Sequence, residues 1–259
     1  MRSRVLRYVT ASLLSTVLVV PFGVRPARAV IDWATVIAAG INVVGTWLNS
    51  STTNAALAEA TRQILAAVNS SKAEILAQME TIAVAEARAC ATHAVIEFVD
   101  IERMTPDNMQ QFAQAATGCV VSIESVMSAI TDKGRVDQLG FAVNMVAPIA
   151  LIARARTGLT TGALENTLRR ANNVIVAKLD ASCDIWSWEV NPDVPPPPDG
   201  RPVNWNIACY SYNNTIGTHY VSVPWPNPIP DSAITVAVNN ANRFTSRAIA
   251  IAVLPMFDA

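Results

Sequence analysis

Apolar residues recur at helical spacing over most of the chain and predict a mainly α-helical protein. In residues 55–105, a run without Gly or Pro, apolar positions repeat at steps of three, four or seven. The repeating residues are Leu57, Ile64, Val68, Ile75, Met79 and Ile82. This stripe predicts one long amphipathic helix suited to a bundle or a coiled coil, with Asn69-Ser70-Ser71 as its weakest point.

Proline divides the following residues into further helices. It disfavours helical geometry in the residue before it but fits the first helical position, so Thr105-Pro106 ends one helix and begins the next. That next helix is expected to run to about residue 131. Residues 136–156 form a strongly apolar segment that Pro148 is expected to kink, and an amphipathic helix is predicted over residues 164–179.

Two further helical patterns lie towards the ends of the chain. Residues 31–48 carry many apolar residues at helical steps and predict a buried helix. Pro230 and Asp231 begin a final helical pattern that runs to Ala248. The last stretch, residues 246–254, fits either a helix or a strand, because short apolar runs do not distinguish the two.

The composition changes sharply in residues 183–230. This segment holds seven of the nine Trp and Tyr residues that follow position 29, no Phe, and a proline tract at residues 195–198. Two β-prone runs, WNIACYSY and THYVSV, are separated by a polar turn and predict two or three strands. We therefore expect a mainly α fold, an antiparallel helical bundle with a small disulfide-closed, β-containing aromatic insertion before the last helix.

The first 29 residues have the pattern of a signal peptide. Three arginines precede an apolar run from Val9 to Phe22, and a small-residue cleavage pattern follows at Ala27-Arg28-Ala29. We expect cleavage near Ala29, secretion from a bacterial cell, and a mature chain, residues 30–259, that forms a single domain.

Removal of this leader makes the chain acidic. It leaves fourteen Lys and Arg residues against twenty Asp and Glu residues, a net charge of about −6. No basic stripe is visible in the sequence. This balance argues against a nucleic-acid partner, because an acidic surface repels phosphate backbones.

The four cysteines of an exported chain are expected to form disulfides, for which three pairings are formally possible. Cys90 and Cys119 each lie about fourteen residues from the turn near Pro106, so an antiparallel hairpin brings them to the same height. Cys183 and Cys209 are likewise centred on the proline tract. We therefore expect the pairs Cys90–Cys119 and Cys183–Cys209.

One cluster has residue types that bind metals. Cys90, His93, Glu97 and Asp100 share a broad helical face, and a thiolate, an imidazole and a carboxylate can hold zinc. The predicted disulfide consumes the Cys90 thiolate, and the other three residues lack the spacing of a specific metal motif. We therefore expect neither a metal site nor a cofactor.

The sequence contains no recognisable catalytic motif. It lacks the GxSxG elbow, the phosphate-binding loop, the dinucleotide-binding glycines and the HExxH pair. Asp184 and Glu189 form the most suggestive pair of carboxylates, although a charged loop rim explains them more simply. We therefore expect a non-enzymatic protein without catalytic residues.

The aromatic clustering is the strongest functional signal. Trp and Tyr combine a large apolar body with a polar tip, which suits binding surfaces as well as small cores. We expect a binding or assembly protein whose partner is an extracellular protein, a cell-envelope component or a glycan. The expected contact residues are Trp186, Trp188, Trp205, Tyr210, Tyr212 and Trp225.

An alternative function is suggested by residues 139–153. Long helices beside a concealed apolar segment are the general layout of helical pore-forming toxins, so this segment could enter a membrane. It is short for a single span and is interrupted by Asn144 and Pro148. A central bundle helix, apolar on all sides because other helices surround it, explains the same pattern.

Overall fold

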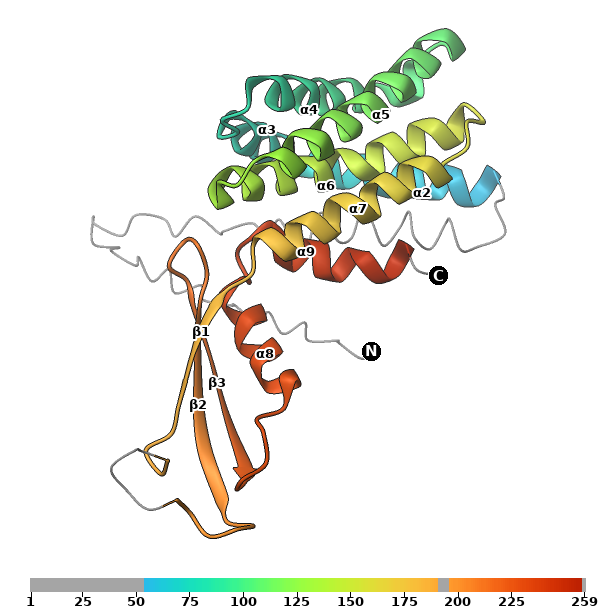
Figure 1. Cartoon of the computed structure of the whole chain (residues 1–259). Helices are drawn as coiled ribbons and strands as arrows, with labels where there is room; N and C mark the ends of the chain where they lie inside the picture. Colours follow the sequence, from blue (N-terminus) through green and yellow to red (C-terminus); the bar gives the residue numbers. More distant parts are fainter. Residues whose placement is uncertain (1–53, 191–195, 258–259) are drawn as a thin grey trace, which may run out of the picture. The chain divides into compact units, whose positions relative to one another are not determined.

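A computed structural model describes residues 54–190 and 196–257 of the chain, which are mainly helical and include one small sheet (Figure 1). The predictions for residues 1–29 and 31–48 lie outside these residues. In chain order the elements are α2 (Asn54–Ser70), α3 (Lys72–Glu80), α4 (Ala85–Phe98), η1 (Ile101–Arg103), α5 (Pro106–Ala129), α6 (Lys133–Arg156), α7 (Gly162–Lys178), β1 (Ser182–Trp186), β2 (Pro202–Tyr210), β3 (Ile216–Pro224), α8 (Asp231–Ala241), α9 (Ser246–Val253) and η2 (Leu254–Phe257).

The start of α5 confirms the prediction made from Thr105-Pro106. Thr105 is the N-cap residue, and its hydroxyl accepts a hydrogen bond from the backbone N–H of Asn108. Pro106 occupies the first helical position, where a missing N–H costs nothing. The helix ends at Ala129, close to the expected position.

The prediction of a single long helix over residues 55–105 is wrong. The chain turns at Ser71, within the predicted weak point, and again between Glu80 and Ala85. At the second turn Ile82 is buried, and the backbone N–H of Ala83 donates to the Gln138 side chain of α6 at 3.0 Å. Packing against α6 therefore interrupts a helix that the local sequence would continue, and a long coiled-coil helix is not formed.

Helix α6 lies at the centre of the core and packs against α2, α4, α5, α7 and α9. Sixteen of its residues, from Val136 to Ala153, are buried on all sides of the helix. Its buried Asn144 side chain donates to the Asn172 side chain of α7 at 3.0 Å. Pro148 lies inside the helix. Other helices enclose α6, which explains why residues 136–153 are apolar on every face of the helix.

Helices α4 and α5 are joined by the predicted disulfide. Cys90 and Cys119 have a Cα–Cα distance of 5.5 Å, which confirms this pair. The same two helices also bury apolar residues against α6 in one continuous core. We call α2–α7 together with α9 the helical region, and the strands β1–β3 together with α8 the sheet region.

The sheet is antiparallel, with strand order β1-β2-β3, and confirms the predicted strands. Cys183 lies opposite Cys209 and forms the second predicted disulfide, with a Cα–Cα distance of 4.0 Å. Helix α8 packs along one face of the sheet (Figure 1). Gly217 makes this approach possible, because a Cβ atom there would lie 2.2 Å from the backbone oxygen of Ala237.

The last helical pattern is divided in two, so the prediction of one continuous helix to Ala248 is wrong. Helix α8 ends at Ala241, and α9 begins after Thr245, whose hydroxyl accepts from the backbone N–H of Arg247. The division lets α8 cover the sheet while α9 packs on α6 and α7. Residues 246–254, whose sequence fits either a helix or a strand, are helical: α9 covers them to Val253, and η2 follows.

Candidate functional site: the outer face of the sheet

The sheet has two faces of different character, because side chains alternate along each strand. The face towards α8 buries a small core made of Ile207, Cys209 and small α8 residues. Among the described residues, α8 is the helix that packs on the sheet. We call the opposite face the outer face. The strand register assigns to it Ser182, Asp184, Trp186, Asn204, Asn206, Ala208, Tyr210, Ile216, Thr218, Tyr220 and Ser222.

Large apolar side chains are exposed together on the outer face. Tyr220 is 71% exposed and Trp186 is 40% exposed, and Tyr210 and Ile216 are exposed as well. Ala208, in the middle of the face, is only 4% exposed. Several exposed aromatic residues on one face are uncommon on the surface of a soluble protein, so the outer face is the candidate site.

The register places Trp186, Asn206 and Tyr220 in one row across the three strands. With strands about 4.8 Å apart, the Cα atoms of the two aromatic residues are separated by roughly 10 Å. Asn206 supplies an amide between the two rings. This row therefore combines two stacking surfaces with one hydrogen-bonding group.

The six predicted contact residues divide into three groups. Trp186 and Tyr210 lie together on the outer face, and Trp188, which is 84% exposed, follows directly after β1. Trp205 is half-buried on the face towards α8, where it pairs with Val221. Tyr212 and Trp225 are also half-buried, beyond the ends of the strands. The structure therefore brings two of the six residues onto one surface and places Trp188 next to it.

Sequence reasoning missed Tyr220 and Ile216 as members of this surface. Both lie on β3, and their face depends on how β3 is aligned with β2. Tyr220 stands two residues before Ser222 in the predicted strand THYVSV, so alternation groups these two residues. Which face that group occupies is decided by the β2–β3 turn, and the composition contains no signal for this.

Charge on the outer face is low. Asp184 is its single ionisable carboxylate, and it lies in one row with Ala208 and Thr218. Glu189, the other member of the suggested carboxylate pair, accepts from the backbone N–H and the side chain of Asn204 at 3.2 and 3.0 Å. It also forms an ion pair with Arg201 at 3.6 Å. Glu189 therefore caps the exposed edge of β2 beyond the end of β1.

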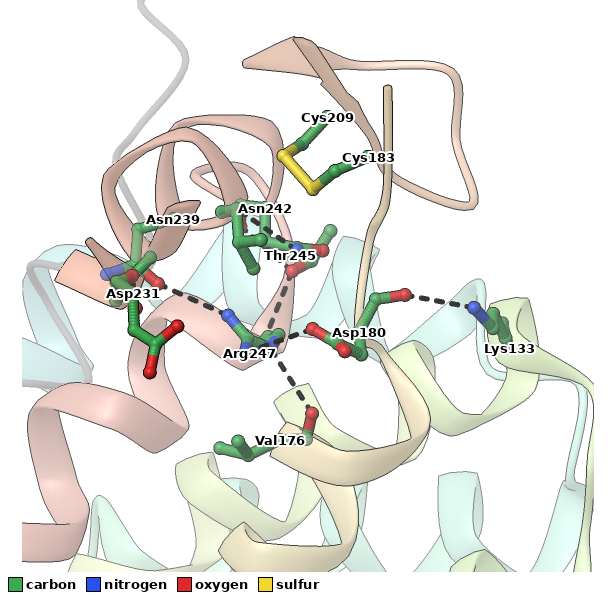
Figure 2. A network of polar contacts seen from close by, with 12 residues as sticks. Lys133, Val176, Asp180, Cys183, Cys209, Asp231, Asn239, Asn242, Thr245 and Arg247 are labelled. Atoms are coloured by element: carbon green, nitrogen blue, oxygen red, sulfur yellow. Dashed lines mark hydrogen bonds and ion pairs between the residues drawn. A yellow bond between two sulfur atoms is a disulfide. The ribbon is translucent and has the colours of Figure 1, made fainter. Parts of the chain in front are cut away.

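A buried arginine connects the sheet region to the helical region (Figure 2). Arg247 of α9 is 9% exposed and donates to the Val176 carbonyl of α7 and to the Asn239 side chain of α8, each at 3.2 Å. It also pairs with Asp180, whose backbone oxygen accepts from Lys133 of α6. Burial lowers the pKa of Arg247, and the nearby Asp180 carboxylate opposes that change.

A second buried contact joins the β2–β3 turn to the same helices. The Tyr212 hydroxyl donates to Asp137 of α6 at 2.6 Å, and the backbone N–H of Ser246 donates to the other carboxylate oxygen, also at 2.6 Å. Burial raises the pKa of Asp137, while these hydrogen bonds act in the opposite direction. Burial and the adjacent Asp137 both raise the pKa of Tyr212.

Cys90, His93 and Glu97 of the suggested metal-binding cluster lie on α4, and Asp100 follows that helix. Cys90 is bonded to Cys119, and His93 is exposed on α4. In residues 54–190 and 196–257, no three His, Cys, Asp or Glu side chains are grouped closely enough to hold a metal ion. The outer face instead offers aromatic rings, amides and hydroxyls, which are groups suited to binding.

Comparison of this chain with models of protein families, with curated proteins and with solved structures finds no match. Function is therefore inferred from the residues of the outer face. Their identity, exposure and alignment are the properties from which a function can be inferred.

Proposed function

We propose that this protein is a secreted, non-enzymatic binding or assembly protein that acts through the outer face of its sheet. The observation that carries the proposal is the grouping of exposed Trp186, Tyr210, Ile216 and Tyr220 on one face while α8 covers the other. In this interpretation the helical region is an antiparallel bundle that supports an aromatic insertion. Its partner is an extracellular protein, a cell-envelope component or a glycan.

The alternative role for these aromatic residues is packing inside the sheet region. That region has a core of its own, formed by Ile207, Cys209, Ala237 and neighbouring small residues around the disulfide. Trp186 and Tyr220 point away from this core and remain exposed. Their side chains are therefore available to a partner at little cost to folding.

The proposal is tested by comparing capture by the parent protein and a variant. The immobilised parent protein is incubated with secreted and cell-envelope fractions of the cells that produce it, alongside a Trp186→Ala/Tyr220→Ala variant. Phe244→Ala is the matched control, because Phe244 is an exposed aromatic residue that lies between α8 and α9. We expect the double variant to lose at least nine-tenths of the captured component. Unchanged capture by this variant would contradict the proposal.

Export is part of the proposal and is tested separately. The basic, apolar and small-residue pattern of residues 1–29 supports cleavage near Ala29. Two disulfides are compatible with an extracellular protein, because the cytosol keeps most thiols reduced. Mass spectrometry of the protein from the culture medium is expected to show a chain without its leader, and an intact Met1 would contradict export.

A second candidate function rests on α6. This helix is long and apolar enough to cross a membrane by length and composition, and 89% of its most apolar window is buried inside the fold. We propose as the alternative a membrane-active protein that releases residues 139–153 on contact with lipid. Dye release from liposomes tests it, and an absence of release across lipid compositions and pH values would count against it.

A further inference from the structure

The outer face is small for a protein interface. Three strands, of which the longest have nine residues, cover roughly 400 Å² at about 4.8 Å between strands and about 3.4 Å per residue. A stable protein interface buries about 800 Å² on each partner. The face is therefore better matched to a narrow, extended ligand than to a globular protein.

The edges of the sheet argue against an extended peptide as this ligand. A peptide that adds as a strand needs free backbone groups along an edge. On β3 the Ile216 and Thr218 carbonyls already accept from the Arg243 and Asn240 side chains, at 3.2 and 3.4 Å. On the other side β1 has only five residues, and Glu189 caps β2 beyond it. The edges are therefore short or partly occupied, whereas the side chains of the outer face are exposed along its length.

The side chains of the outer face suit an uncharged ligand rich in hydroxyl groups. Trp186, Tyr210 and Tyr220 provide aromatic surfaces, and the polar residues between them are mainly amides and hydroxyls. Amides donate and accept hydrogen bonds, as sugar hydroxyls require, and the C–H faces of sugar rings pack on aromatic rings. Asp184 is the single charged residue of the face, and no Lys or Arg is present there to hold an anionic chain.

We infer that the outer face binds an extended, uncharged polysaccharide, with sugar rings stacked on Trp186 and Tyr220 and hydroxyl groups bonded to Asn206 between them. This inference rests on the proposed function and identifies its ligand. The Cα atoms of Trp186 and Tyr220 are roughly 10 Å apart across three strands, so one chain crossing the strands can reach both side chains.

The test is a depletion assay with the full protein and insoluble polysaccharides. Cellulose and chitin serve as extended, β-linked probes, and amylose serves as a coiled, α-linked control. We expect the parent to bind at least one extended probe and Trp186→Ala/Tyr220→Ala to bind it at least tenfold more weakly. Phe244→Ala, which removes an exposed ring elsewhere, should bind within about twofold of the parent.

A conservative variant separates ring stacking from misfolding. Trp186→Phe/Tyr220→Phe keeps an aromatic ring at both positions and should retain binding within about fivefold of the parent, because a stacking surface remains at each. Circular dichroism and intact disulfides confirm that each variant is folded. A polysaccharide bound equally well by the parent and by the Ala variant would overturn the inference, because binding would then occur elsewhere.

The remaining outcomes distinguish the ligand from the proposed function. If the parent binds none of the extended polysaccharides but the Ala variant still loses a captured protein or peptide, the polysaccharide inference is overturned and the binding function stands. If the parent captures neither polysaccharides nor any envelope or secreted component, both are overturned. Stronger binding to amylose than to the extended probes would also overturn the inference.

Discussion

The helical region and the sheet region each contain one disulfide, with sequence separations of 29 and 26. The two regions differ in how much apolar surface they bury. The helical region has a continuous core around α6, including Phe98, Leu151 and Leu168. The core between the sheet and α8 is small and is built mostly of Ala, Ile207 and the disulfide itself. Similar covalent links therefore support regions that depend on them to different extents.

This difference also assigns roles to the two regions. A region with a large core can hold its structure without help from any single contact. A small region that leaves its aromatic residues partly exposed gains less stability from them than from fully buried side chains. It depends instead on the Cys183–Cys209 bond, on α8 and on the polar contacts made by Arg247 and Asp137.

The largest expected effect comes from removing each disulfide. By the loop-entropy estimate each is worth about 3 to 4 kcal/mol. Cys183→Ala/Cys209→Ala should lose the sheet, seen as a changed Trp fluorescence while the helical circular dichroism remains. Cys90→Ala/Cys119→Ala should keep both signals and unfold at a lower urea concentration. A single unfolding transition with the same loss in both variants would contradict the comparison.

The second expected effect comes from Gly217, where α8 approaches the sheet. In Gly217→Ala the new Cβ would lie 2.2 Å from both the Ala237 oxygen and the Ala241 nitrogen, which are backbone atoms that cannot move alone. We expect a loss of about 3 kcal/mol in the free energy of unfolding. Gly118→Ala is the matched control on α5, where the new Cβ would have no atom within 4 Å apart from the adjoining backbone of its own helix. It should stabilise the protein by about 0.5 to 1 kcal/mol, because Ala favours the helix.

The third prediction concerns the buried carboxylate that joins the two regions. Asp137→Ala removes the acceptor of the Tyr212 hydroxyl and of the Ser246 N–H, so we expect a loss of about 2 kcal/mol in urea unfolding. Asp137→Asn keeps an acceptor oxygen and should lose less. An Ala variant as stable as the parent would show that this contact does not hold the regions together.

The same carboxylate predicts a pH dependence. Burial raises the pKa of Asp137 above its unfolded value, so the folded state binds the proton more tightly. The tighter proton binding by folded Asp137 contributes stability that is fully present at pH values below the ordinary aspartate range. This stability is lost as the pH rises through the raised pKa of the folded state. Acidification from neutral pH should therefore stabilise the parent more than Asp137→Asn, as measured by urea midpoints. Equal pH profiles would contradict this assignment.

The smallest expected effect is that of Tyr212→Phe. The ring keeps its packing against the core, and only the hydrogen bond to Asp137 is lost, so we expect about 1 kcal/mol. Although the sequence places Tyr212 among the contact residues, we expect this variant to capture its partner as the parent does. A tenfold loss of binding with unchanged stability would show that Tyr212 is part of the binding surface.

Part of the candidate site could be predicted from the sequence. The clustering of Trp and Tyr pointed to the segment that forms the sheet, and Trp186 and Tyr210 do share its exposed face. Trp205 and Tyr220 could not be assigned in this way, because both are aromatic residues in β-prone runs. Only the strand register places the first towards α8 and the second on the outer face. A shift of one residue in β3 against β2 would turn Tyr220 to the opposite face.

The sequence by itself determined the features that capping residues or regular spacing fix. Thr105-Pro106 set the start of α5 through capping and proline geometry, and equal spacing about two turns indicated both disulfide pairs. Tertiary structure alone decided the break after Glu80, the separation of α8 from α9 and the composition of the outer face. Each of these depends on contacts between residues far apart in the chain, such as Ala83 with Gln138 and Gly217 with α8, which no local pattern contains.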